Sequence, residues 1–153
     1  MLGALTFGLK VAMSYLPNIE PVSLLVMIFA VVFGKKCLYP IYLYVTMEIL
    51  YYGINFWNVN YLYVWAILAV ATIAMRRFKN PVLWACLSGF FGLAFGLLCC
   101  PVYMVTGGSV RYGILWWLKG LPYDVLHAVG NFAITLTLFV PLRKLLSRLY
   151  GKM

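Results

Sequence analysis

The sequence predicts an all-α membrane protein with six transmembrane helices, both termini in the cytoplasm and a single domain over residues 1–153. The chain is 65% hydrophobic and 10% charged, with a mean hydropathy of +0.97. Soluble domains are roughly 45–50% apolar and about 25% charged. Its apolar runs are also separated by brief connections carrying small basic groups, a pattern that sets orientation in a membrane. The net charge of +9 therefore indicates membrane orientation rather than nucleic-acid binding.

The first three segments are bounded by proline, glycine and polar residues. A segment over 2–16 stops at Pro17, and a second over 19–34 stops at a Gly-Lys-Lys sequence. A third covers 37–54 and precedes a polar, aromatic turn at 55–60. The first two are shorter than the ~20 residues that span a typical bilayer.

The last three segments follow the same logic. The fourth covers 61–75 and stops at an Arg-Arg-Phe-Lys sequence, and the fifth starts at Pro81 and reaches about residue 105. The sixth covers 121–142 and ends at a basic pair. Between the last two, residues 106–119 contain a Gly-Gly-Ser sequence followed by aromatics, which predicts a loop with a short interfacial helix.

Basic residues predict the orientation. Nine of the twelve lie at the ends of the second, fourth and sixth segments, so those ends and both termini are expected in the cytoplasm. All three acids then fall at mid depth or toward the outer face. The nine basic residues are Lys35, Lys36, Arg76, Arg77, Lys79, Arg143, Lys144, Arg148 and Lys152.

The sixth segment carries a polar stripe. Asp124, His127 and Asn131 fall within an arc of about 60° on a helix, since each residue advances roughly 100°, and Thr135 follows on the same stripe. Such groups are costly in lipid and normally face a cavity, a partner or a substrate path. The alternative is that they hold neighbouring helices together.

Two further charged residues are expected at the same depth. Lys10 in the first segment and Glu48 in the third lie at mid to outer depth, as Asp124 does. The functional interpretation is one polar substrate pocket built by three helices. The structural interpretation is an ion pair, either Lys10–Glu48 or Lys10–Asp124, that holds the bundle together.

An aromatic and amide-rich cluster follows the third segment. Trp57, Asn58 and Asn60 are candidates for a lid over the pocket, because aromatic faces and amides suit a flat polar ligand. An interfacial aromatic belt would explain many of the same residues. The cluster as a whole comprises Tyr51, Tyr52, Asn55, Trp57, Asn58, Asn60 and Tyr61.

Small residues recur on two helices. Ala4, Gly8 and Ala12 form a stripe in the first segment that allows close helix approach, either within the bundle or to a partner protein, and Lys10 projects from the opposite side. The fifth segment has a similar set at Gly89, Gly92 and Gly96, for which packing inside the bundle is favoured.

Several chemistries lack the residues they need. His127 is the only histidine and the four cysteines form no CxxC pair, so no metal site or cofactor is predicted. The sequence has no GxxxxGK[ST] phosphate loop. Asp124 and His127 could act as an acid–base pair in a membrane-embedded enzyme, but no nucleophile can be placed beside them. Binding is therefore favoured over catalysis.

The sequence resembles a known family in three places. These are Leu16–Leu25 after a helix with small residues, Gly34–Lys36 leading to Tyr39-Pro40, and Gly120–Phe132. With six helices and a short basic tail, they resemble a substrate-binding membrane subunit, or S component, of the energy-coupling-factor transporters, a group of ABC importers. The similarity covers nearly the whole chain, and Gly120–Phe132 is its most specific part.

The resemblance implies a function and a set of partners. It implies a multi-pass protein of a prokaryotic plasma membrane that binds a vitamin or precursor near the outer face. It also implies docking on a membrane coupling subunit that carries two ATP-binding subunits. The family's small-residue docking motif maps onto Ala4, Gly8 and Ala12, with glycine in place of the central alanine. Its pocket maps onto Asp124, His127 and Asn131. Two alternatives to this function remain: the membrane-embedded enzyme and a structural or assembly membrane protein.

Overall fold

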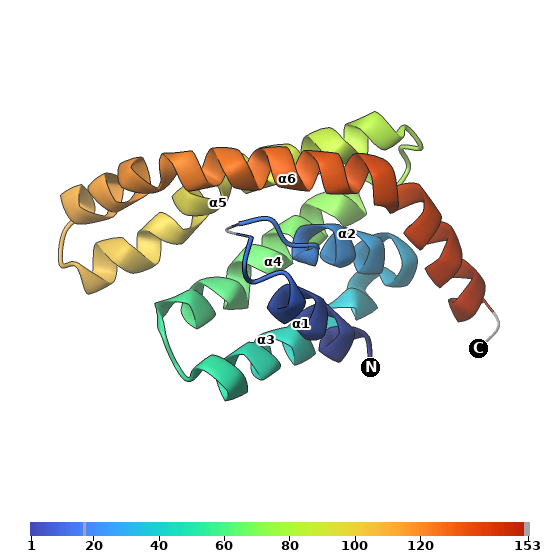
Figure 1. Cartoon of the computed structure of the whole chain (residues 1–153), viewed down its shortest axis with the longest axis horizontal. Coiled ribbons are helices and arrows are strands. Elements are labelled where there is room, and N and C mark those ends of the chain that lie inside the picture. Colours follow the sequence, from blue (N-terminus) through green and yellow to red (C-terminus); the bar gives the residue numbers. More distant parts are fainter. Residues whose placement is uncertain (17, 152–153) are drawn as a thin grey trace.

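The structure, a computed structural model, describes residues 1–16 and 18–151, so Pro17 and Lys152 lie outside the described residues. Within these ranges the chain is helical and contains no strand (Figure 1). The helices are α1 (Leu2–Ala12), α2 (Val22–Phe33), the 3₁₀ helix η1 (Gly34–Cys37), α3 (Leu38–Tyr52), α4 (Phe56–Met75), α5 (Pro81–Thr106) and α6 (Val110–Tyr150).

Four helical runs in the described part are long and apolar enough to cross a membrane. They are Val22–Tyr52, Phe56–Met75, Pro81–Thr106 and Val110–Tyr150. The all-α class is therefore confirmed, and the long apolar helices indicate a multi-pass membrane protein. The α1 helix has 11 residues, about half the length that a bilayer requires. Six separate spans stay a prediction.

The first long run is interrupted by a glycine. Gly34 has a φ of +58°, a backbone conformation that glycine adopts without steric cost. The chain therefore turns between α2 and α3 (Figure 1), leaving helices of 12 and 15 residues. Residues 22–30 of α2 are all buried, which makes α2 the central helix, packed between α4 and α6.

The α5 and α6 helices form a long hairpin, and Figure 1 shows them side by side over much of their length. The predicted loop with an interfacial helix at 106–119 is wrong, because only residues 107–109 separate α5 from α6. The Ser109 hydroxyl caps α6 by accepting a hydrogen bond from the Tyr112 amide at 3.1 Å. The Tyr103 and Trp116 rings then stack 3.6 Å apart across the hairpin, which keeps this stretch helical.

A second predicted connection is also shorter than expected. The turn proposed for 55–60 is mostly helix, because α4 already begins at Phe56. Asn55 caps it: its side-chain oxygen accepts hydrogen bonds from the amides of Trp57 and Asn58 at 2.9 and 3.4 Å. Asparagine is a preferred N-cap residue, so the polar cluster starts a helix rather than forming a loop.

The basic connections, Met1 and the end of α6 lie at one end of the bundle. The rings of Phe33 and Tyr150 meet edge to face at 4.9 Å, and Met1 lines the same surface groove as both. Lys35 and Arg76 line another groove there. Met1 and the C-terminal ends of α2, α4 and α6 therefore share one end of the molecule. Its assignment to the cytoplasm stays a prediction.

Candidate functional site

A polar pocket lies at the opposite end of α4 from Arg76. It is bounded by the C-terminal part of α1, the connection before α2, the end of α3 and the start of α4, and its volume is about 370 Å³. This is within the range of small-molecule sites, about 300–1,000 Å³. The lining residues are Lys10, Asn18, Glu20, Glu48, Tyr52, Asn55, Trp57, Asn58 and Tyr61.

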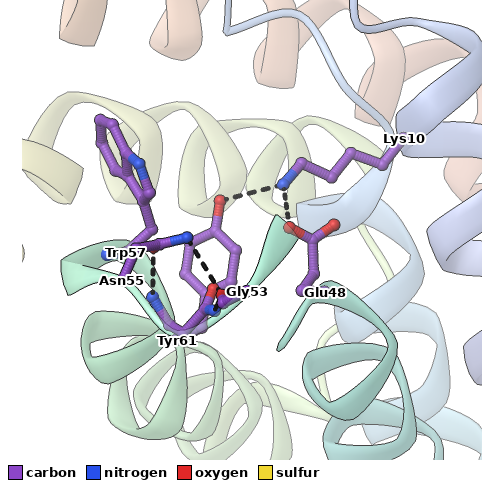
Figure 2. A network of polar contacts seen from close by, with 7 residues as sticks. Lys10, Glu48, Gly53, Asn55, Trp57 and Tyr61 are labelled. Atoms are coloured by element: carbon purple, nitrogen blue, oxygen red, sulfur yellow. Dashed lines mark hydrogen bonds and ion pairs between the residues drawn. The ribbon is translucent and has the colours of Figure 1, made fainter. Parts of the chain in front are cut away.

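An ion pair joins two of the helices in this pocket. Lys10 Nζ lies 2.6 Å from Glu48 Oε2 and donates a longer hydrogen bond of 3.3 Å to the Tyr61 hydroxyl, as Figure 2 shows. The Lys10–Glu48 pairing considered from the sequence is confirmed, and the alternative pairing of Lys10 with Asp124 is not formed. The pair ties α1 to α3 at the edge of the pocket.

Glu48 retains one carboxylate oxygen for further contacts. The residue is 3% exposed, and Oε2 is bound by Lys10. Its other oxygen, Oε1, is buried and has no hydrogen-bond partner among the described residues. A buried carboxylate oxygen without a partner is costly, so Glu48 is the residue here best suited to meet a ligand donor.

Glu20 adds a second carboxyl group. It lies in the connection before α2 and lines the same pocket as Glu48. Its pKa is raised above the ordinary value, mainly because burial disfavours the charged form; attraction to Lys10 lowers the pKa and repulsion from Glu48 raises it. Two acids and one lysine are thus gathered at one site.

The lid candidates have different positions. Trp57 is 55% exposed at the rim, whereas Asn58 is buried and donates a hydrogen bond of 2.7 Å to the Gly53 carbonyl. Figure 2 shows Asn55 and Trp57 on the side of the pocket away from Lys10. Asn60 does not line the pocket: it is fully buried and accepts a hydrogen bond from Tyr63 at 2.9 Å.

The polar stripe of α6 faces α5. The Asp124 carboxylate accepts a hydrogen bond of 3.1 Å from the Gly96 amide. Asn131 donates to the Ser23 hydroxyl at 3.0 Å and to the Ser88 carbonyl at 3.2 Å. These side chains are buried and link α6 to α5 and α2.

Close packing explains why this stripe is enclosed. A Cβ atom on Gly92 would lie 2.8–2.9 Å from the backbone of His127 and Ala128, and one on Gly96 would overlap the Asp124 carboxylate. The expected packing role of these glycines is confirmed. His127 contacts the Phe95 ring, with ring centroids 4.9 Å apart, and no hydrogen bond joins it to Asp124. The enzyme alternative stays a prediction.

The expected convergence on one pocket is therefore wrong. Lys10 and Glu48 line the pocket, but the α6 stripe does not. A chain of aromatic contacts lies between them, running from Tyr61 to Trp65 to Phe95 with centroid separations of 5.3 and 5.7 Å. An expected common depth along the membrane does not fix which helices pack together. Ligand contact by Asp124, His127 and Asn131 stays a prediction.

The small-residue stripe of α1 is exposed. Ala4, Gly8 and Ala12 all lie on the outer surface, and a Cβ atom on Gly8 would meet nothing within 4 Å. The opposite side of α1 contacts α3, where a Cβ on Gly3 would lie 2.6 Å from the Pro40 carbonyl oxygen. Of the two alternatives, packing of this stripe within the bundle is wrong.

Five lining residues were not among the predicted site residues: Asn18, Glu20, Tyr52, Asn55 and Tyr61. The two tyrosines lay in the aromatic cluster, but nothing separated them from an interfacial belt. Glu20 was a scarce acid at the expected outer edge, and that scarcity was the available signal. Asn18 gave no comparable signal.

The described residues contain no group of three or more histidine, cysteine or acidic side chains placed to hold a metal ion. No protein-family model, curated protein or solved structure significantly matches this chain.

Proposed function

We propose that the chain is the membrane-embedded substrate-binding subunit of an energy-coupling-factor importer for a vitamin or a similar micronutrient. The observation that carries the proposal is the polar pocket with the Lys10–Glu48 pair. It lies about 30 Å from the basic end of the molecule, given the 20 residues of α4 at 1.5 Å each. With the basic end in the cytoplasm, the pocket faces outward.

The connections around the pocket suit ligand capture. The segment before α2 carries Asn18 and Glu20, and the Asn18 amide donates a hydrogen bond of 3.2 Å to the Tyr123 carbonyl of α6. This contact fastens the segment to the hairpin beside the pocket. In the proposed mechanism, this segment moves when the ligand enters, and its return with Trp57 covers the ligand.

The sequence contains no phosphate loop, so in this proposal a partner hydrolyses the ATP that drives transport. The exposed stripe of Ala4, Gly8 and Ala12 supports docking of a membrane coupling subunit with two ATP-binding subunits, since small residues permit close helix contact in lipid. Movement driven by these subunits would then open the loaded pocket toward the cytoplasm.

Two residues of α6 are proposed as further ligand contacts, deeper in the molecule than the pocket. Asp124 Oδ2 and His127 Nε2 are buried without a hydrogen-bond partner in the described part of the chain. Both are therefore available to a ligand that moves inward past the aromatic residues. Asn131 is already engaged by Ser23 and Ser88, which favours a packing role for it.

The experiment is purification in detergent followed by mass spectrometry of small molecules that remain bound. A retained water-soluble micronutrient, and its uptake when the partner subunits are co-expressed, support the proposal. Turnover of a lipid or amide by the purified chain alone would instead establish the enzyme alternative. A chain that retains nothing and whose loss disturbs another complex would be an assembly protein.

Docking is tested with two glycines of α1. Gly8→Leu should abolish co-purification with the coupling subunit while ligand retention persists, because the added side chain projects from the free surface. Gly3→Leu is the contrasting variant and should lower stability through its clash with Pro40 and Leu43. Intact assembly of the Gly8→Leu protein would show that this stripe is not the docking surface.

A further inference from the structure

The pocket has the opposite charge to the rest of the molecule. The chain carries a net charge of +9 and only three acidic residues, yet two of them, Glu20 and Glu48, line this pocket with a single basic residue, Lys10. With both carboxyls ionised the site sums to −1, from one positive and two negative charges. The rest of the chain carries 11 basic residues and one acid and sums to +10, so the pocket concentrates acidic groups against the overall composition.

The contacts of Lys10 show which kind of chemical group the pocket residues can hold. Its ammonium contacts the Glu48 carboxylate at 2.6 Å and the Tyr61 hydroxyl at 3.3 Å. It also lies 5.0 Å from the centroid of the Tyr61 ring and 5.7 Å from that of Tyr52, within the range of cation–π attraction. The side chain is thus an internal example of an alkylammonium held by a carboxylate, a phenol and aromatic faces.

A second ammonium would find free acceptors here. Glu48 lines the site and is 3% exposed, and its Oε1 atom is buried without a hydrogen-bond partner among the described residues. Glu20 supplies another carboxyl group, and Trp57 another aromatic side chain. Lys10 is already compensated by Glu48, so it has little attraction left for an anionic ligand.

We propose that the pocket selects small molecules that carry a positively charged amino group. Glu48 Oε1 and the Glu20 carboxylate accept hydrogen bonds from that group, and Tyr52 and Trp57 face it. This inference rests on the proposed function, because it names the chemical class of the substrate that the same pocket takes up.

The test is equilibrium dialysis of the purified full chain against a pool of water-soluble compounds in three charge classes, with the retained compounds identified by mass spectrometry. The pool includes benzylamine, benzyl alcohol and benzoate, which share one ring and differ in charge, and vitamins and precursors of each class. Selective retention of amines is expected. Retention of neutral or anionic compounds would overturn the charge inference and leave the proposed function standing. Retention of nothing would overturn both.

Substitutions at Glu20 and Glu48 separate charge from shape. Glu20→Gln should weaken amine retention about tenfold, which corresponds to about 1.4 kcal/mol, while Glu20→Asp should restore most of it. Glu48→Gln should cause a larger loss. Because that change also leaves Lys10 unpaired, Lys10→Met/Glu48→Gln is measured beside it and should lose amine retention too. Unchanged retention in Glu20→Gln and in the double variant would contradict the proposal.

Discussion

The pocket and the α5–α6 interface place polar side chains inside an apolar protein in different ways. In the pocket, the Lys10–Glu48 pair leaves Glu48 Oε1 without a partner beside about 370 Å³ of space. In the interface, Asn131 is held by Ser23 and Ser88, and glycines bring the helices into contact. Polar groups with free acceptors beside a cavity indicate binding. Polar groups whose donors are already used indicate packing.

Asp124 and His127 lie between these two cases. Both are enclosed by α5, as packing residues are, but Asp124 Oδ2 and His127 Nε2 lack hydrogen-bond partners among the described residues. Buried polar atoms of this kind are uncommon in folded proteins. The two regions can be separated by substitutions that disturb one and spare the other.

The largest effect is expected at the helix interface. Gly92→Leu should prevent close approach of α5 and α6, because even a Cβ atom would lie within 2.9 Å of the α6 backbone. We expect a loss of more than about 3 kcal/mol, the upper part of the range for overpacking. Thermal unfolding in detergent measures it, with Gly8→Leu as the control that adds the same side chain where space is open. A stable Gly92→Leu protein would mean that the interface is loose.

A smaller loss is expected from breaking the ion pair. Lys10→Met should cost about 2 kcal/mol, below the 3–5 kcal/mol of fully buried pairs, because the Lys10 side chain is 18% exposed. The loss arises from leaving the Glu48 carboxylate buried without compensation. Lys10→Met/Glu48→Gln should recover part of the stability. If the double variant is no more stable than Lys10→Met, the pair contributes little to the fold.

Much of this contrast could be predicted from the sequence, because helix periodicity alone places Asp124, His127 and Asn131 on one face. The glycines of α5 and the scarcity of acids were equally visible. The sequence did not show which helices pack together, since an expected common depth in the membrane does not make Lys10 and Asp124 neighbours. Their separation depends on aromatic contacts between α4 and α5.

Helix ends were the least predictable feature for a related reason. The Gly-Gly-Ser sequence at 107–109 suggested a long loop, yet capping by Ser109 and stacking of Trp116 on Tyr103 start α6 at once. Tertiary contacts of this kind override local turn signals. The same applies at 55–60, where Asn55 caps α4.

The substitution Asp124→Asn tests whether Asp124 serves ligand binding or only helix packing. Asparagine keeps an oxygen that can accept the Gly96 amide, so stability should change little. If Asp124 Oδ2 meets the ligand, retention of the co-purifying molecule should fall about tenfold, or about 1.4 kcal/mol. Dialysis with the labelled ligand measures this. Unchanged retention would assign Asp124 to the helix interface alone.

The smallest effect is expected from a change of pH. Lowering the pH should stabilise the fold and weaken amine binding. Burial is the main cause that raises the pKa of Glu20; attraction to Lys10 lowers this pKa, and repulsion from Glu48 raises it further. Tyr52 and Tyr61 also line the site. The folded chain therefore keeps the Glu20 proton to a higher pH than the unfolded chain does. Between the two pKa values, lowering the pH stabilises the fold.

Amine binding uses the Glu20 carboxylate, so retention should fall several-fold as the pH drops through the raised pKa of Glu20 toward 4.5, the ordinary pKa of glutamate. Thermal unfolding and dialysis at matched pH values measure the two trends. Glu20→Gln should flatten both, whereas Glu20→Asp should keep them. Parallel trends in stability and retention would show that the pH dependence comes from unfolding rather than from Glu20. Amine binding would then depend on the Glu48 carboxylate alone, the same group that pairs with Lys10.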